Sequence, residues 1–227
     1  MAHLPKSTFD FISKLEKNNN REWFTENKPT YELEREKIIK FAEQLLAEMN
    51  KHDNIENENG KKCLHRIYRD IRFSKDKTPY KNHWPISLKR ATQKLRGSYY
   101  VHLQPAKVFI GCGFWGPSKE DLYRIRQQIS HFGNELSSIL NDKKFKKEFG
   151  TLEGDKLKNG PKDFDKEDPN IELLKYKQFM ISRTFTNDEV FAPNFTKEVS
   201  NSFKRMRPFL DFMSEALTTN LNGESIL

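Results

Sequence analysis

Residues 98–114 read SYYVHLQPAKVFIGCGF, and this stretch decides the fold. Apolar side chains recur at every second position in Ser98–Gln104 and again in Lys107–Phe114, which is the period of a half-buried strand. Pro105 and Ala106 join the two runs by a connection short enough for a β-hairpin. The sequence therefore predicts two antiparallel strands here, and the other elements follow outward from them.

Three more strands are predicted on either side of this hairpin. His83–Leu88 precedes it, and Phe179–Phe185 lies far downstream. Cys63–Phe73 is predicted as a strand because isoleucines and a phenylalanine alternate there with polar residues. Residues 74–83 show no clean period and contain Pro79, so we expect a loop.

Helices are predicted before and after the strands from apolar spacings of three and four. The first 50 residues contain two such stripes, a short one that Ser7 or Thr8 could cap and a longer one that starts near Pro29. A third helix follows a capping signature at Ser118, and a fourth follows Asn194. The apolar positions are Phe9, Ile12, Leu15, Ile38, Phe41, Leu45, Met49, Leu122, Ile125, Ile129, Phe132, Leu136, Ile139, Val199, Phe203 and Met206, with Pro208 as a kink or stop.

This order of elements indicates an α+β fold, in which helices at both ends of the chain flank a mostly antiparallel sheet of four to six strands. We expect one domain over residues 1–227, because the chain shows no linker, repeat or low-complexity tract. Residues 141–170 are charged and rich in Gly and Pro, and such a long loop is a candidate lid or a surface loop. The tryptophans Trp23, Trp84 and Trp115 are predicted to be core or pocket-wall residues.

Composition narrows the class of protein. The 227 residues include 28 aromatic side chains, 18 of them Phe, which compensate for an apolar fraction of only 35%. Cys63 and Cys112 are expected to be free thiols of a cytoplasmic protein, and zinc spacing is absent. No run approaches the ~18–20 apolar residues of a membrane span. We expect no membrane association, no cofactor and no metal, although His65, His83 and His102 would suit a metal or acid–base chemistry if they converged.

Positive charge is concentrated in residues 61–96. This segment has 12 Lys and Arg against Asp70 and Asp76, a net charge of +10, so the rest of the chain carries −2 of the total of +8. Charge gathered in one place indicates a bound anion or polyanion. If residues 64–73 are a strand, Arg66, Asp70 and Arg72 share one face with Tyr68, while Arg69 shares the other with Ile67, Ile71 and Phe73. The candidate anion-binding residues are Arg66, Arg69, Asp70, Arg72, Lys75, Asp76, Lys77, Tyr80 and Lys81.

The run R-x-x-R-D-x-R-F-S-K-D-K-x-P-Y-K from Arg66 to Lys81 resembles the uncharacterised bacterial and fungal proteins called domain of unknown function 2461. Residues 20–24 (NREWF), the strand at 100–103 and the pieces at 111–115 and 157–169 are also similar, so the resemblance covers nearly the whole chain. It implies a single domain of about this length and no established activity.

Four hypotheses remain open for the central segment. In the first, Arg66 and Arg72 grip a phosphate or carboxylate, Asp70 orients them, and the following loop closes over the ligand. The second is nucleic-acid binding through the same basic patch. The third is an enzyme for a phosphorylated or carboxylated small molecule, in which Tyr80, Asp76 or a histidine transfers the proton. The fourth is a structural ion-pair network with a protein partner.

Overall fold

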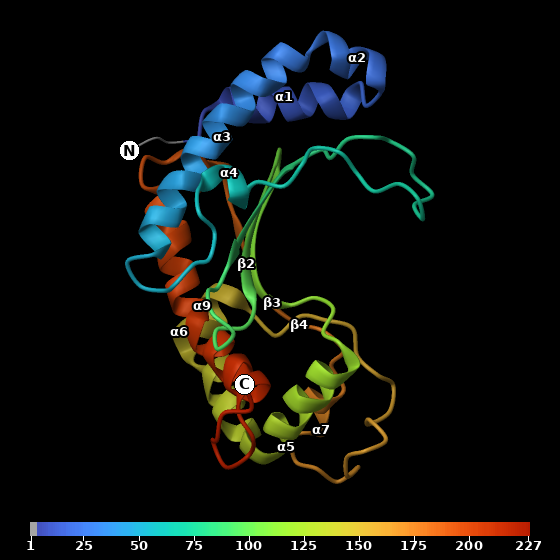
Figure 1. The fold of residues 1–227 in the computed structure, drawn as a ribbon, viewed down its shortest axis with the longest axis vertical. Helices are drawn as coiled ribbons and strands as arrows, with labels where there is room; N and C mark the ends of the chain where they lie inside the picture. The colour runs from blue at the N-terminus through green and yellow to red at the C-terminus, as the bar shows by residue number, and fades with distance from the viewer. Residues whose placement is uncertain (1–3) are drawn as a thin grey trace. The chain divides into compact units, whose positions relative to one another are not determined.

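The computed structural model describes residues 4–227, so residues 1–3 of the predicted domain lie outside the described part. The fold is α+β, as predicted, with helices on both sides of the strand block in the chain (Figure 1). Residues 4–227 contain one four-stranded antiparallel sheet in the order β1-β2-β3-β4. Its strands are β1 (Trp84–Lys89), β2 (Ser98–Gln104), β3 (Lys107–Phe114) and β4 (Phe179–Phe185). The predicted hairpin is therefore confirmed.

The helices fall where the apolar stripes place them, with several short additions. The long ones are α1 (Lys6–Lys17), α3 (Lys28–Met49), α5 (Lys119–Asn141) and α9 (Phe195–Thr218). The short ones are α2 (Arg21–Glu26), α4 (Gly60–Cys63), α6 (Lys143–Phe149), α7 (Ile171–Leu174) and α8 (Asn187–Phe191). Asn59-Gly60, a dipeptide typical of turns, forms the start of α4, where the Asn59 side chain accepts a hydrogen bond from the Lys62 backbone N–H at 3.0 Å.

Helix boundaries test the predicted caps. Ser118 caps α5, since its hydroxyl accepts from the Asp121 backbone N–H at 3.0 Å, as expected. The predicted Ser7 or Thr8 cap is wrong, because α1 begins after Pro5 and the Thr8 hydroxyl donates to the Pro5 carbonyl at 2.7 Å. Within the tripeptide Asn18-Asn19-Asn20, Asn20 caps α2 through the Trp23 backbone N–H at 2.9 Å.

Two expectations about bulky residues need correction. The predicted stop at Pro208 is wrong, because α9 continues to Thr218, with Leu210 and Met213 fully buried beyond the proline, whereas a kink there stays a prediction. Burying side chains of that size stabilises by about 1.5–3 kcal/mol each, which offsets the ~3 kcal/mol that an internal proline costs. Trp115 is 73% exposed and is not a core residue.

The chain divides into two compact units, and each is described by itself. Of the described residues, unit 1 comprises 4–88, 100–110 and 184–201, and unit 2 comprises 89–99, 111–183 and 202–227. Trp84 is buried in unit 1, stacked on Tyr31 at 5.7 Å between ring centroids. In unit 2 the ring of Tyr99 packs on Phe203 at 4.7 Å. The single-domain organisation stays a prediction.

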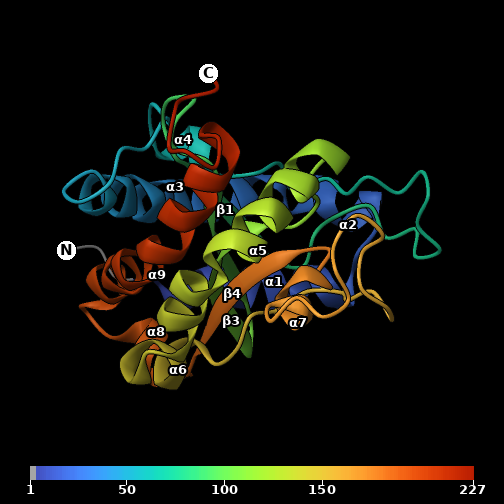
Figure 2. The ribbon, with the colours of Figure 1, turned by 90° about the horizontal axis from the view of Figure 1, so that it is seen from below.

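Residues 141–170, predicted as a long loop, lie in unit 2. Of these, residues 143–149 form α6, which contacts α5, and α7 also lies against α5 (Figure 2). The remaining residues of 150–170 are irregular. Among residues 4–227, no helix combines the length and apolar character that crossing a membrane requires.

Candidate functional site

The basic central segment forms an irregular hairpin loop, which we define as residues 64–83 (Figure 1). Its two arms pair around Tyr68 and Tyr80, where the Arg69 N–H donates to the Pro79 carbonyl at 2.9 Å. The Lys81 N–H likewise donates to the Ile67 carbonyl, at 2.8 Å. The predicted strand Cys63–Phe73 is therefore wrong, because only isolated bridges form within it.

Side chains take the backbone acceptors that a strand would use. The Lys81 ammonium donates to the carbonyls of Arg66 at 2.5 Å and Tyr68 at 2.7 Å. The Lys77 ammonium donates to the Ile71 carbonyl at 2.9 Å. Lysine side chains therefore occupy carbonyls that a neighbouring strand would otherwise use in a ladder. The predicted loop at 74–83 is confirmed.

The hairpin loop is anchored to the first helices of unit 1. The Asn19 side chain pairs with the backbone of Tyr80, accepting from its N–H at 3.0 Å and donating to its carbonyl at 2.9 Å. The Tyr80 ring stacks on Phe24 with centroids 4.0 Å apart and also packs near Tyr68 at 5.4 Å. Tyr80 is buried as a result, and it fixes the base of the hairpin loop.

Arg69 ties the two arms together beside the Tyr68–Tyr80 bridge. Its guanidinium bonds to the Asp76 carboxylate at 2.5 Å, to the Thr78 carbonyl at 3.2 Å and to the Thr78 hydroxyl. The Thr78 N–H and hydroxyl also donate to Asp76, at 2.9 and 3.0 Å. Hydrogen bonds from Thr78 and Arg69 lower the pKa of Asp76 to about 2, so this carboxylate is charged at neutral pH.

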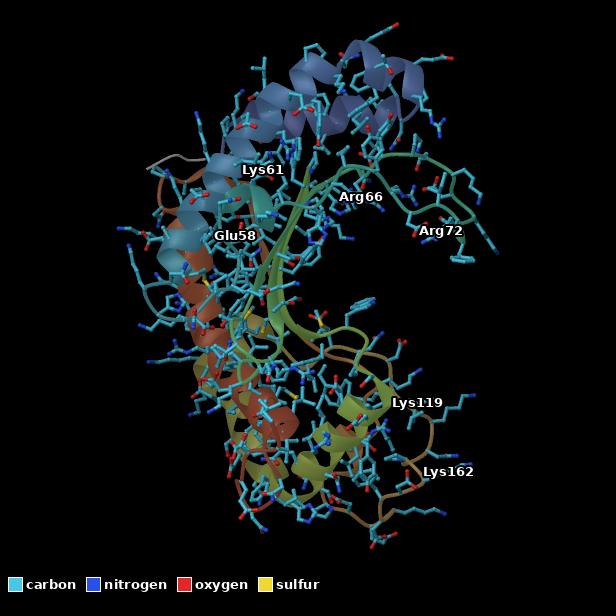
Figure 3. The ribbon with its side chains drawn as sticks, viewed as in Figure 1. Glu58, Lys61, Arg66, Arg72, Lys119 and Lys162 are labelled. Carbon is cyan, nitrogen blue, oxygen red and sulfur yellow. The ribbon has the colours of Figure 1, made fainter. Side chains whose placement is uncertain are left out.

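Asp70 and Arg72 form a two-pronged ion pair, with Nε–Oδ1 and Nη2–Oδ2 distances of 2.9 and 2.6 Å. The hydrogen bonds from Arg72 lower the pKa of Asp70 below its ordinary value. The predicted pairing of an arginine with Asp70 is therefore present. However, the Arg72 side chain is 76% exposed and lies near the tip of the hairpin loop, whereas Arg66 lies nearer its base (Figure 3).

Two of the candidate cations differ from the rest in their contacts. Within residues 4–227, the side chains of Arg66 and Lys75 make no hydrogen bond or ion pair, and both residues are exposed. Arg66 lies close enough to Lys81 to lower the pKa of that ammonium, after burial and together with Arg69. The base of the hairpin loop thus holds three positive groups whose charges oppose one another.

A pocket of about 540 Å³ opens in unit 1 beside the hairpin loop. It is lined by Glu16, Asn19, Arg69, Asp70, Asp76, Thr78, Tyr80, Lys81, Asn82 and His83. Five predicted site residues therefore meet there: Arg69, Asp70, Asp76, Tyr80 and Lys81. The others do not line it, namely Arg66, Arg72, Lys75 and Lys77.

Sequence reasoning missed half of the pocket lining. Asn82 and His83 directly follow Lys81, so extending the charged run by two residues would have included them. Asn19 lies in the run Asn18-Asn19-Asn20, which by sequence is typical of a helix break and not of a ligand pocket. Glu16, whose carboxylate accepts from the Asn82 amide at 2.7 Å, gave no local signal, because only folding brings residues 16 and 82 together.

Two of the three central histidines converge at the edge of the pocket. The rings of His83 and His102 stack at 4.1 Å, and His102 also stacks on Phe109 at 4.6 Å. Burial, followed by the nearby His102 and Lys81, lowers the pKa of His83 to about 4. His65 bonds separately to the Ser87 hydroxyl at 2.7 Å. Across residues 4–227 no group of three or more His, Cys, Asp or Glu is placed to hold a metal.

Comparison with known proteins agrees with the resemblance in the sequence. The model of the family described as "Conserved hypothetical protein (DUF2461)" matches residues 7–212. No curated protein and no solved structure gives a significant match.

Proposed function

We propose that this chain, which belongs to the DUF2461 family, recognises a small molecule carrying a phosphate or carboxylate in the pocket beside the hairpin loop. One observation carries the proposal. Lys81 lines the pocket, and burial lowers the pKa of its ammonium, as do the nearby charges of Arg66 and Arg69. An anion placed there would relieve the repulsion among the three cations.

The acids of the hairpin loop neutralise only one of these three cations, Arg69, which is paired with Asp76 at 2.5 Å. Three carboxylates line the pocket, and each already has a partner. Asp70 is engaged by Arg72, Asp76 by Arg69 and Thr78, and Glu16 accepts from the Asn82 amide. Arg66 has no acceptor within residues 4–227, so its five donors are available to a ligand. Asn19, Asn82 and Tyr80 add uncharged polar residues to the lining, and the pocket volume is within the ~300–1,000 Å³ typical of small-molecule sites.

The protonation states favour binding over acid–base catalysis. An efficient general acid or base has a pKa near the working pH. The three groups considered for proton transfer have pKa values far from 7. The pKa of Asp76 is about 2, that of His83 is about 4, and burial raises that of Tyr80 above its ordinary value. At pH 7 these groups hold fixed protonation states, which suits recognition of a ligand.

The test is calorimetric titration with inorganic phosphate and with phosphorylated and carboxylated small molecules. We expect Arg66→Ala and Lys81→Ala each to weaken binding by about tenfold. Lys61→Ala is the matched control, because Lys61 carries one charge of the same basic segment but, unlike Arg66, is not among the charges that act on Lys81. Arg66→Ala should leave the melting temperature unchanged, which separates lost contacts from lost structure. Equal binding by wild type, Arg66→Ala and Lys81→Ala would refute the proposal.

A second candidate function, binding of single-stranded nucleic acid, is supported by the tip of the hairpin loop. Phe73 is 96% exposed, and the Arg72 guanidinium lies 5.9 Å from its ring centroid. Bases stack on such aromatic and guanidinium surfaces while nearby lysines contact phosphates. Lys75 and Lys77 flank the tip in the sequence.

Fluorescence anisotropy with labelled oligonucleotides distinguishes the two candidates. For nucleic-acid binding, affinity should fall linearly with salt on logarithmic axes, and Phe73→Ala should weaken it by about tenfold. Phe73→Ala should not affect small-anion binding, because Phe73 does not line the pocket. Failure of any oligonucleotide to bind at low salt would eliminate this second candidate.

A further inference from the structure

A second pocket lies in unit 2, where the irregular segment after α6 meets α7. Its volume is about 420 Å³, and it is lined by Lys158, Asn159, Gly160, Lys166, Ile171 and Lys175. None of these residues is among the site residues predicted from the sequence, where residues 141–170 are expected to be a lid or a surface loop. The pocket therefore adds a site that is independent of the hairpin loop.

The walls of this pocket are held by backbone contacts. The Leu157 N–H donates to the Lys175 carbonyl at 2.8 Å, and the Lys177 N–H donates to the Asp155 carbonyl at 2.8 Å. These bonds set the segment carrying Lys158 against the end of α7, with an antiparallel bridge between Lys156 and Tyr176. Lys158 and Lys175 are therefore fixed on neighbouring strands of backbone.

The other wall is fastened to α5. The Ser130 hydroxyl donates to the Asp168 carboxylate, whose other oxygen accepts from the Asn170 N–H at 2.7 Å. Asn170 fits against Gly133, where an added Cβ would lie 2.3 Å from the Asn170 amide. These contacts place the turn that follows Lys166 close to α5, so the pocket belongs to an anchored segment of unit 2.

The charges lining this pocket are all positive. Of the residues that line it, three are lysines and none is acidic, within the part of the chain that the structure describes. Lys175 is bonded to Glu172 at 2.5 Å. Across residues 4–227, the ammonium groups of Lys158 and Lys166 make no ion pair or hydrogen bond. A concave site with two uncompensated cations and a third nearby attracts a multiply charged anion.

We propose that this pocket binds a phosphate-bearing small molecule. Lys158 and Lys166 would contact the phosphate oxygens, since ammonium groups bind phosphate as point charges. The Asn159 amide would donate to a further oxygen. Ile171 supplies the apolar wall, and the absence of a side chain at Gly160 keeps that wall open, because a Cβ there would lie 2.9 Å from the Ile171 Cδ1. The volume suits a phosphate ester of metabolite size.

The test is calorimetric titration of the full-length protein with inorganic pyrophosphate at fixed ionic strength. We expect the double variant Lys158→Ala, Lys166→Ala to weaken binding by about tenfold or more. Lys162→Ala is the matched control, because Lys162 belongs to the same segment and does not line the pocket (Figure 3). The exposed side chains of Lys158 and Lys166 make no contacts that fold the segment, so melting curves of the double variant should match wild type.

Three outcomes would overturn the proposal. These are absence of pyrophosphate binding to the wild type, unchanged binding by the double variant, or an equal loss in Lys162→Ala, which would indicate diffuse surface charge. The single variant Lys81→Ala distinguishes binding at the two pockets, because Lys81 lines only the pocket beside the hairpin loop. A loss caused by Lys81→Ala and not by the double variant would assign pyrophosphate to the hairpin-loop pocket and refute this one.

Discussion

The guanidinium of Arg69 holds the carboxylate of Asp76 at 2.5 Å, and the same guanidinium bonds to both oxygens of Thr78. Three residues from the two arms of the hairpin loop are thereby joined at one point. Because Arg69 and Asp76 both line the larger pocket, this contact determines the shape of its wall. Predictions about the hairpin loop therefore begin with Arg69.

Replacing Arg69 with Lys should loosen the hairpin loop although the charge is kept. A lysine offers a point charge in place of a planar fork, so it cannot bond to Asp76 and Thr78 together. We expect a stability loss of about 1 kcal/mol and faster amide hydrogen exchange in residues 74–82. Thermal melts and exchange measured by mass spectrometry would check this. Arg124→Lys, which alters an exposed pair on α5, should change neither; unchanged exchange in Arg69→Lys would contradict the prediction.

The contribution of Asp76 should depend on pH with a definite sign. Its pKa falls from 3.8 to about 2 on folding, so its stabilising effect is present above pH ~4 and is lost as the pH falls through about 2. Asp76→Asn should therefore melt below wild type at pH 7, and the difference should shrink steadily between pH 4 and pH 2. Melts of both proteins across this range provide the measurement. A difference that stays constant to pH 2 would show that the carboxylate charge is not responsible.

Gly60 at the start of α4 should not tolerate a side chain. An added Cβ would lie 2.5 Å from both the Glu43 backbone nitrogen and the Ile39 carbonyl oxygen, and backbone atoms cannot move aside cheaply. We expect Gly60→Ala to lower stability by about 1–3 kcal/mol in chemical denaturation. Gly116→Ala is the control, since nothing lies within 4 Å of its added Cβ. Equal stability of the two variants would mean that α4 can shift away from α3.

Arg90 is a buried charge in unit 2, with a side chain only 2% exposed that is paired to Asp211 and bonded to the Ser214 hydroxyl at 3.2 Å. Asp211→Ala should cost about 2–3 kcal/mol, because a buried guanidinium loses its counter-charge while Asp211 itself is half exposed. Adding Arg90→Met should recover part of that loss. Urea denaturation of the single and double variants measures the coupling, and purely additive losses would contradict it.

Both cysteines should resist thiol reagents in the folded protein. Burial raises the pKa of Cys63 to about 11 and raises that of Cys112 further, and the two side chains are buried as free thiols. The thiolate is the reactive form, so modification should await unfolding. Titration with a chromogenic disulfide should detect both thiols in denaturant and almost none in native buffer. Rapid native reaction at either cysteine would show that local opening exposes it.

Helices and strands that have a local sequence pattern could be predicted from the sequence alone. Strands β2 and β3 and the connection at Pro105-Ala106 follow from alternation, and α5 follows from its stripe and the Ser118 cap. Alternation failed at 63–73, because a strand needs a partner along its length and the side chains of Lys77 and Lys81 occupy the carbonyls that a partner would use. An alternating pattern predicts which face of a segment is buried, but it does not show whether a neighbouring strand is present to pair with that segment.

The same division applies to the candidate sites. The sequence alone located the positive charge in one segment, since charge is a property of composition. The tertiary structure was needed to show which of those charges are already paired, with Asp70 engaging Arg72 and Asp76 engaging Arg69. It also showed that Glu16 of α1 and Asn19, which follows α1, join the pocket from far away in the chain. It also placed Lys158 beside Lys175 by backbone bonds. Pairing and pocket walls depend on contacts between distant residues, which no local pattern encodes.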